Sequence, residues 1–212
     1  PFGVGKVKSL GNIDTAKFLA KSKTFFVNHG ITFLDEEFNY EISDGADYIF
    51  CEGVAIKSNP YFNYLPMKPT HGDILTIKSS DLKLDEVVNK NMFILPLGDN
   101  QYKVGATYNW DLDEAIPTEN GKAELIEKLK SFTTFSFEIV KHEAGIRPTV
   151  SDRRPLIGVH PEHSNLYVFN GLGTKGVMIA PFYSKQLSDF IDEKGTLNEA
   201  VDIKRHQKYY NA

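Results

Sequence analysis

The sequence predicts an α+β fold in which a β-rich middle segment is inserted between two outer parts of mixed character. Helix-like periodicity is confined to residues 11–30, 118–129 and 177–192. Between residues 60 and 105 the apolar runs are short and are separated by Pro or Gly, which is typical of antiparallel strands. With 212 residues, 41% of them hydrophobic, the chain can bury a substantial core.

The first part of the chain is expected to alternate between strand and helix. A strand is predicted at residues 6–10, followed by a helix within residues 11–30. Asp14 is a suitable N-cap for this helix, and Gly30 is a suitable residue after its end. Three further strands are predicted at residues 31–34, 38–42 and 47–51. The last of them ends at Gly53.

The middle and last parts contain a predicted hairpin and two more helices. The residues GDN at 98–100 separate two strand-like runs and favour a hairpin turn. A helix is predicted over residues 118–129, with Thr118 as its cap, and a strand over residues 135–142. The final helix is expected over residues 177–192.

Composition excludes several classes of partner. The 24 basic and 28 acidic side chains give a net charge of -4 without a basic block, so nucleic acid is not an expected partner. No apolar run reaches the roughly 18 residues of a membrane span. Cys51 is the single cysteine, which fits a reducing compartment and a cytoplasmic protein. The six histidines lack metal-ligand spacing, so no metal site is expected. Because the chain opens on Pro1, we expect a piece of a longer protein.

A glycine-rich loop precedes the final helix. Gly171, Gly173 and Gly176 have G-x-G-x-x-G spacing between an apolar run and the helix. No second strand follows, so the loop is not a complete dinucleotide-binding unit. Two interpretations remain: a plain strand-to-helix turn, or an anion-binding site at the helix start, strengthened by the helix dipole and by Lys175.

A second candidate site is the sequence GIRP at residues 145–148. Proline favours an extended conformation for the preceding residue, Arg147, and the strand before it should hold this arginine rigidly. A guanidinium presented in this way suits bidentate capture of a carboxylate. The alternative is a structural ion pair between Arg147 and Glu143 or Asp152.

These segments resemble the C-terminal part of the flavin-dependent oxidoreductases of the D-amino-acid oxidase superfamily, which includes glycine oxidase and sarcosine oxidase. The resemblance rests first on GIRPTVSDRRPLIG, on HPEHSNLYVFNGLGTKGVMIAP and on the closing helix. Upstream it continues through GNIDTAKFLAKSKTFFVNHGITF, ADYIFCEGVAI and NMFILPLGDNQYKVGATYN. It covers most of residues 11–191.

The resemblance implies a domain division. Residues 12–58 and 143–212 would be the C-terminal parts of a FAD-binding domain. Residues 1–11 and 59–142 would form an inserted, mostly antiparallel substrate-binding domain. Members of the family carry their own G-x-G-x-x-G segment before everything present here, so this chain would be a fragment that binds FAD weakly alone.

The resemblance also implies a function: hydride transfer from a C–N bond of an amino acid or related amine to FAD. Arg147 would hold the substrate carboxylate. The residues implied in FAD binding are Gly53, Gly145, Gly171, Gly173, Thr174, Lys175, Gly176, Val177 and Met178. Sarcosine-oxidase-like members carry a lysine where Met178 stands, so carboxylate binding would depend more on Arg147 here. They also attach the flavin through a cysteine near Gly145, so FAD would be non-covalent here. The alternative is a non-catalytic module that binds a small carboxylate or a protein partner, and the oligomeric state is left open.

Overall fold

The computed structural model describes residues 3, 5–8, 11–42 and 45–210, and the chain divides into two units, Pro1–Glu41 and Ile42–Ala212. The first unit contains helix α1 (Thr15–Asn28). Asp14 caps this helix by accepting a hydrogen bond of 3.0 Å from the Lys17 N–H, as predicted. No side chain of α1 is buried.

Three strands predicted for the first part of the chain are not found. Residues 6–8 form no strand, and residues 9–10 lie outside the described residues. The predicted strands at 31–34 and 38–42 are irregular, and Ile31 and Leu34 are exposed. Apolar alternation produces a strand only where a partner strand supplies hydrogen bonds and a surface to pack on. In the described part of the chain, no strand pairs with these segments.

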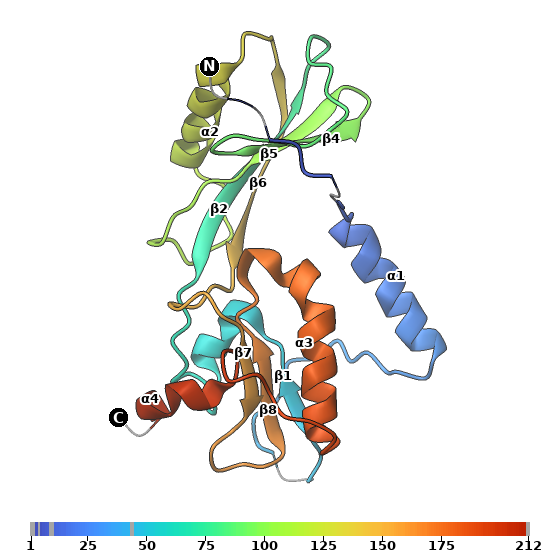
Figure 1. Cartoon of the computed structure of the whole chain (residues 1–212), viewed down its shortest axis with the longest axis vertical. Helices are drawn as coiled ribbons and strands as arrows, with labels where there is room; N and C mark the ends of the chain where they lie inside the picture. Colours follow the sequence, from blue (N-terminus) through green and yellow to red (C-terminus); the bar gives the residue numbers. More distant parts are fainter. Residues whose placement is uncertain (1–2, 4, 9–10, 43–44, 211–212) are drawn as a thin grey trace. The chain divides into compact units, whose positions relative to one another are not determined.

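The second unit contains a five-stranded antiparallel sheet with the order β3-β4-β5-β2-β6, so the predicted α+β class is confirmed (Figure 1). Its strands are β2 (Thr70–Lys78), β3 (Val88–Asn89), β4 (Phe93–Gly98), β5 (Gln101–Gly105) and β6 (Glu138–Arg147). The predicted hairpin joins β4 to β5. Asp99 and Asn100 have φ values of 49° and 59°, as a two-residue turn with both central residues left-handed requires.

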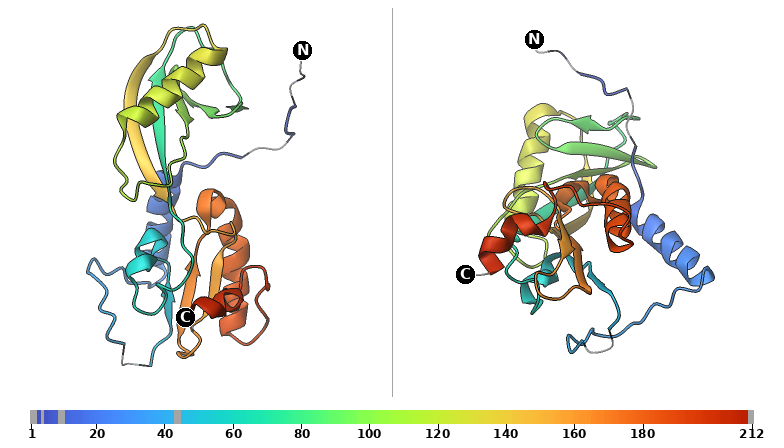
Figure 2. Two further views of the ribbon diagram at one scale, coloured as in Figure 1. Left: turned by 90° about the vertical axis from the view of Figure 1, so that its left-hand side faces the viewer. Right: turned by 60° about the horizontal axis from the view of Figure 1, so that its bottom comes forward.

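Helix α2 (Glu119–Phe132) lies across one face of this sheet (Figure 2). Its residues Leu125 and Leu129 are fully buried in the core formed with the sheet. The sheet contributes Leu75, Ile77, Met92, Ile94, Tyr102 and Val104 to the same core. Thr118 caps α2 by accepting a 3.0 Å hydrogen bond from the Gly121 N–H, as the sequence predicts.

A buried carboxylate joins α2 to the sheet. Asp73 of β2 is only 1% exposed. Its carboxylate accepts hydrogen bonds from the Thr118 N–H at 2.8 Å and from the Thr118 hydroxyl at 3.0 Å. It also accepts from the Thr107 hydroxyl at 3.2 Å and lies 2.8 Å from the His142 Nε2. A Cβ on Gly121 would lie 1.9 Å from the carboxylate, so only glycine permits this approach of the helix start.

The second unit also contains a separate three-stranded sheet with the order β1-β8-β7 (Figure 1). Strand β1 (Tyr48–Phe50) runs parallel to β8 (Leu166–Asn170), and β7 (Leu156–Val159) is antiparallel to β8. Helix α3 (Gly176–Ile191) packs Leu187 into a core with Ile157 and Tyr167. The short elements are η1 (Gly53–Ser58), η2 (Gly173–Lys175), η3 (Ile203–His206) and α4 (Gln207–Tyr210).

The chain enters and leaves the five-stranded sheet through two adjacent segments. The ladder between β2 and β6 continues as an antiparallel bridge between Met67 and Val150. The Lys68 N–H donates a 2.8 Å hydrogen bond to the Thr149 carbonyl. The segment that leads into β2 and the segment that follows β6 are therefore hydrogen-bonded to each other next to Arg147, the last residue of β6.

We expect Leu125→Ala to lower the free energy of unfolding by about 2–5 kcal/mol, because it leaves a cavity under the sheet. Leu97→Ala is the control, since Leu97 is 47% exposed, and it should change stability by less than about 0.5 kcal/mol. Urea unfolding followed by circular dichroism measures both. Equal losses in the two variants would contradict the core described above.

We also expect a pH dependence of stability from Asp73. Burial raises the pKa of its carboxyl, but hydrogen bonds from Thr118 and His142 outweigh burial and hold the pKa below its ordinary value. The ionised carboxylate therefore stabilises the fold above the unfolded pKa, and this contribution is lost as the pH falls through the lower folded pKa. Unfolding free energies measured between neutral pH and pH of about 3 should fall more steeply below about 3.9 in the wild type than in Asp73→Asn. Parallel profiles would contradict this.

Candidate functional site

Arg147 is the last residue of β6, and its guanidinium is held by backbone carbonyls rather than by a carboxylate. Nη1 donates hydrogen bonds of 3.3 Å to the carbonyls of His71 and Thr107. The guanidinium carbon lies 4.5 Å from the centroid of the Tyr108 ring, a distance typical of a cation–π contact. Three fixed groups therefore define its position.

The ion pairs that the sequence offered as an alternative for Arg147 are not formed. Glu143 lies 2.6 Å from the Lys141 amino group, and Asp152 lies 2.9 Å from Nε of Arg205. Among the described residues, no carboxylate forms an ion pair with Arg147. Burial lowers the pKa of its guanidinium, but the pKa of an arginine is so high that the group stays charged at neutral pH. The site therefore holds a positive charge that can bind an anion.

Two glycines that face each other across the ladder make room for this arrangement. Gly72 of β2 pairs with Gly145 of β6. A Cβ on Gly72 would lie 2.2 Å from Nη2 of Arg147, whereas a Cβ on Gly145 would meet nothing within 4 Å. Sequence reasoning missed Gly72. A glycine inside the strand THGDILTIK was the available signal, because such glycines often mark a close approach.

Strand alternation places the site on the sheet face opposite α2. Asp73, Leu75 and Ile77 face the helix and its core. Side chains alternate along a strand, so Gly72 belongs to the other face, together with its partner Gly145. Arg147 is two residues beyond Gly145 and shares that face.

The glycine loop begins where two parallel strands end. Asn170, the last residue of β8, donates a 2.9 Å hydrogen bond from Nδ2 to the carbonyl of Gly53 after β1. Its Oδ1 accepts a 2.7 Å bond from the Gly171 N–H. Gly171 has φ 70°, and a Cβ there would lie 2.6 Å from Val150. Sequence reasoning missed Asn170, although a polar residue closing the apolar strand LYVFN was a usable signal.

The loop is tied to the Arg147 segment. Gly173 has φ 56°, a conformation that favours glycine, and its N–H donates a 3.1 Å hydrogen bond to the carbonyl of Pro148. Pro148 follows Arg147 directly in the sequence. The structure therefore brings together the two candidate sites that the sequence suggested separately.

The start of α3 follows directly on the short helix η2 of the glycine loop. Lys175 occupies the N-cap position, and no side chain caps the helix there. Lys175 and Thr174 are exposed, and Met178 in the first turn is 70% exposed. The first N–H groups of a helix have no intrahelical partner, and together with the helix dipole they favour negative charge. This supports the anion-binding interpretation of the loop.

All predicted site residues lie in the second unit. Arg147 and Gly145 share one face of β6, and Gly53 is connected to the loop through Asn170. The remaining predicted residues form one continuous segment: Gly171, Gly173, Thr174, Lys175, Gly176, Val177 and Met178.

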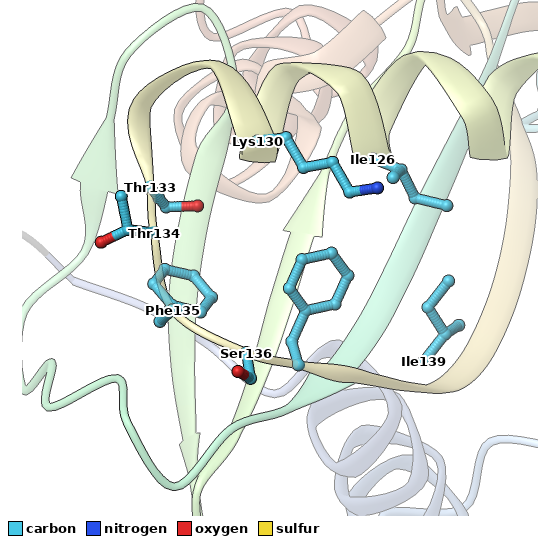
Figure 3. A pocket seen from close by; sticks show the side chains of 8 residues that line it. Ile126, Lys130, Thr133, Thr134, Phe135, Ser136 and Ile139 are labelled. Carbon is cyan, nitrogen blue, oxygen red and sulfur yellow. The ribbon is translucent and has the colours of Figure 1, made fainter.

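A separate hollow of about 610 Å³ lies between the end of α2 and the start of β6 (Figure 3). Ile126 and Lys130 reach into it from the helix, opposite Phe135 and Ile139. Ile139 is eight residues before Arg147 on the same strand, which corresponds to about 26 Å at about 3.3 Å per residue. None of the predicted site residues lines this hollow.

Two kinds of feature are absent from the described residues. No cluster of three or more His, Cys, Asp or Glu side chains there could hold a metal ion. In the same part of the chain, no helix combines the length and the apolar character needed to cross a membrane.

Sequence comparison identifies relatives among flavoenzymes. Residues 13–190 match the family model described as FAD dependent oxidoreductase. Glycine oxidase of Bacillus subtilis is 28% identical over 134 residues, which cover 62% of this chain and 36% of that protein. The tRNA 5-methylaminomethyl-2-thiouridine biosynthesis bifunctional protein MnmC of Idiomarina loihiensis is 28% identical over 132 residues, covering 59% of this chain and 22% of that protein. The chain thus spans only a part of these relatives.

Structural comparison agrees with the sequence. Iminodiacetate oxidase from Chelativorans sp. BNC1 superposes with a TM-score of 0.72 at 20% identity, covering 91% of this chain and 58% of that chain. Glycine oxidase from Bacillus cereus has a TM-score of 0.58 at 20% identity, covering 70% and 42%. These similarities show a common fold. With a family model matched over residues 13–190, the chain belongs to the family of FAD dependent oxidoreductases.

Proposed function

We propose that this chain carries the carboxylate-binding site and part of the flavin site of an enzyme that oxidises an amino acid or related amine at its C–N bond. The observation that carries the proposal is Arg147, whose charge is fixed by two carbonyls and a ring and lacks a carboxylate partner within the described residues. Glycine oxidase and iminodiacetate oxidase, to which the chain is similar, are named for amines that bear carboxylates.

Arg147 would bind the substrate carboxylate. Its Nη1 is occupied by the carbonyls of His71 and Thr107, while Nη2 and Nε donate no hydrogen bond within the described residues and remain available as a pair of donors. A planar carboxylate matches such a pair. The absence of a side chain at Gly145 leaves open space on the same face of the sheet, where the rest of a small substrate fits.

The residues at the loop and at the start of α3 would hold FAD. Gly171 and Gly173 adopt conformations that glycine favours, and the uncapped N–H groups of α3 with Lys175 favour a negatively charged edge of the ligand. When bound, FAD supplies the hydride acceptor for C–N oxidation. Gly145 provides no nucleophile, so we propose that FAD is bound non-covalently.

The domain division is also a proposal. The five-stranded sheet would form the substrate domain, and the three-stranded sheet with α3 would be part of the FAD-binding domain. Because the chain covers 36% of the Bacillus subtilis glycine oxidase, we propose that this segment alone holds FAD weakly. A cytoplasmic location is proposed from the single cysteine.

A second candidate is a carboxylate-binding module without catalysis. The favouring observation is that every group that fixes Arg147 lies within this chain. The two candidates differ in one outcome. The catalytic proposal requires that a carboxylate-bearing amine reduces bound flavin, and the alternative requires binding without reduction.

In the natural full-length protein loaded with FAD, Arg147→Ala should raise KM for an amino-acid substrate roughly 100-fold, because loss of one partner of a buried charge pair costs about 2–5 kcal/mol. FAD content, measured by flavin absorption, should stay stoichiometric. Arg154→Ala is the control, since Arg154 is an exposed turn residue, and its KM should not change. Equal loss of substrate and FAD binding in Arg147→Ala would contradict the carboxylate role.

Two facing glycines provide a second test. Gly72→Ala should displace the Arg147 guanidinium, since its methyl group would lie 2.2 Å from Nη2, while Gly145→Ala should leave it in place. The stability of both variants should change by less than about 1 kcal/mol, because only a flexible side chain has to move. Crystal structures of the two variants report the position of Arg147. An unmoved guanidinium in Gly72→Ala would contradict the described packing.

A further inference from the structure

We infer that Asp73 is a positioning residue that fixes the Arg147 guanidinium by clamping the loop between β5 and α2. The inference rests on the proposed role of Arg147 in binding a carboxylate. Asp73 itself lies on the opposite face of β2 and makes no contact with Arg147, so it acts through Thr107. Neither the glycine motif nor the GIRP motif contains it.

The loop at residues 106–118 supplies two of the three groups that hold Arg147. These are the carbonyl of Thr107, at 3.3 Å from Nη1, and the ring of Tyr108. The loop lies outside the regular strands, because β5 ends at Gly105 and α2 begins at Glu119. The position of the guanidinium therefore depends on what fixes this loop.

Asp73 holds the beginning of the loop through the Thr107 hydroxyl. The hydroxyl donates to Oδ2 of Asp73 at 3.2 Å and accepts a 2.8 Å hydrogen bond from the Asp73 N–H. Because the same hydroxyl is engaged as donor and as acceptor, its orientation is determined. The Thr107 N–H also donates to the Asp73 carbonyl at 3.2 Å. Thr107 therefore has three hydrogen bonds to one residue.

Asp73 also holds the end of the loop. Its Oδ1 accepts from the Thr118 N–H at 2.8 Å, and its Oδ2 accepts from the Thr118 hydroxyl at 3.0 Å. Two residues earlier on the same face of β2, His71 adds a third point, because its Nε2 donates to the Ile116 carbonyl at 2.9 Å. A single carboxylate thus binds residues at both ends of the segment that faces Arg147.

The Asp73 carboxylate is suited to this task because both of its oxygens accept hydrogen bonds and it is buried from solvent. It is buried, and its contacts are hydroxyls, one backbone N–H and the imidazoles of His142 and His71, the latter at 3.6 Å. An amide in its place would present donors to groups that are themselves donors, and a buried unmade hydrogen bond is strongly unfavourable. Asp73→Asn should therefore release the loop without a large change in volume.

The test uses the natural full-length protein labelled with ¹⁵N-arginine, and the probe is sodium acetate. The Arg147 Nε–H resonance is assigned by its absence in Arg147→Lys. Its heteronuclear NOE reports side-chain order without a ligand, and its shift during titration reports acetate affinity. We expect Asp73→Asn and Thr107→Val to lower the NOE and to weaken acetate about tenfold, the effect of losing a hydrogen bond to a charged group.

Two controls separate positioning from general destabilisation. Thr107→Ser keeps the hydroxyl and should restore both the NOE and the affinity. Leu125→Ala weakens the core on the α2 side and should leave the Arg147 signal unchanged. If Asp73→Asn does not fold, the comparison of Thr107→Val with Thr107→Ser tests the inference, because the two variants differ in the hydroxyl that binds Asp73.

A wild-type NOE in Thr107→Val would overturn the inference, as would equal effects of Leu125→Ala and Thr107→Val. Failure of the wild type to bind acetate would instead contradict the proposed function of Arg147. The positioning role of Asp73 can still be tested in that case, because the heteronuclear NOE of Arg147 is measured without a ligand.

Discussion

The ladder between β2 and β6 is the constraint on which both polar sites depend. It pairs residues that are about 70 positions apart, from Thr70 with Arg147 to Lys78 with Glu138. Since side chains alternate between the two faces of a strand, the same ladder directs Asp73 toward α2 and leaves Gly72 on the open face. A shift of one residue would exchange these faces, so the register decides where the buried carboxylate and the guanidinium lie.

The charge of Arg147 is compensated differently from that of Arg205, the other half-buried arginine. Arg205 forms an ion pair between its Nε and Oδ2 of Asp152 at 2.9 Å, and its Nη2 donates a 2.8 Å hydrogen bond to the Pro155 carbonyl. Arg147 has only carbonyl dipoles and the Tyr108 ring. Such groups lower the energy of a partly buried cation but do not neutralise it, so the remaining attraction is available to an anion. This contrast distinguishes a structural pair from a binding site.

Glycine serves three separate purposes around the site. At Gly72 it admits the guanidinium, at Gly121 it admits the Asp73 carboxylate, and at Gly171 it allows φ 70° beside Val150. Each close approach joins segments that are distant in the sequence. A methyl group at any of these positions would displace the side chain that lies against it, so the site depends on the absence of side chains as well as on its charged groups.

The sequence by itself determined the features that arise from neighbouring residues. The capping of α2 by Thr118, the left-handed turn at Asp99 and Asn100 and the glycine loop before α3 follow from local backbone preferences, and the structure has them. The extended backbone at Arg147 belongs with them, because proline restricts the residue before it. The assignment of roles to these residues and the domain boundaries remain predictions.

Only the tertiary structure decided the features that require contact between distant segments. The strands expected at 31–34 and 38–42 do not form, because a strand depends on a partner that no local pattern specifies. The contribution of Asp73 was not visible in the sequence for the same reason, and the contact that Asn170 makes could not be read from its place at the end of an apolar strand. A carboxylate or an amide becomes a link between elements only when folding brings a hydrogen-bond partner to it. Thr107, a partner of Asp73, is 34 residues away from it, and Gly53, the partner of Asn170, is 117 residues away.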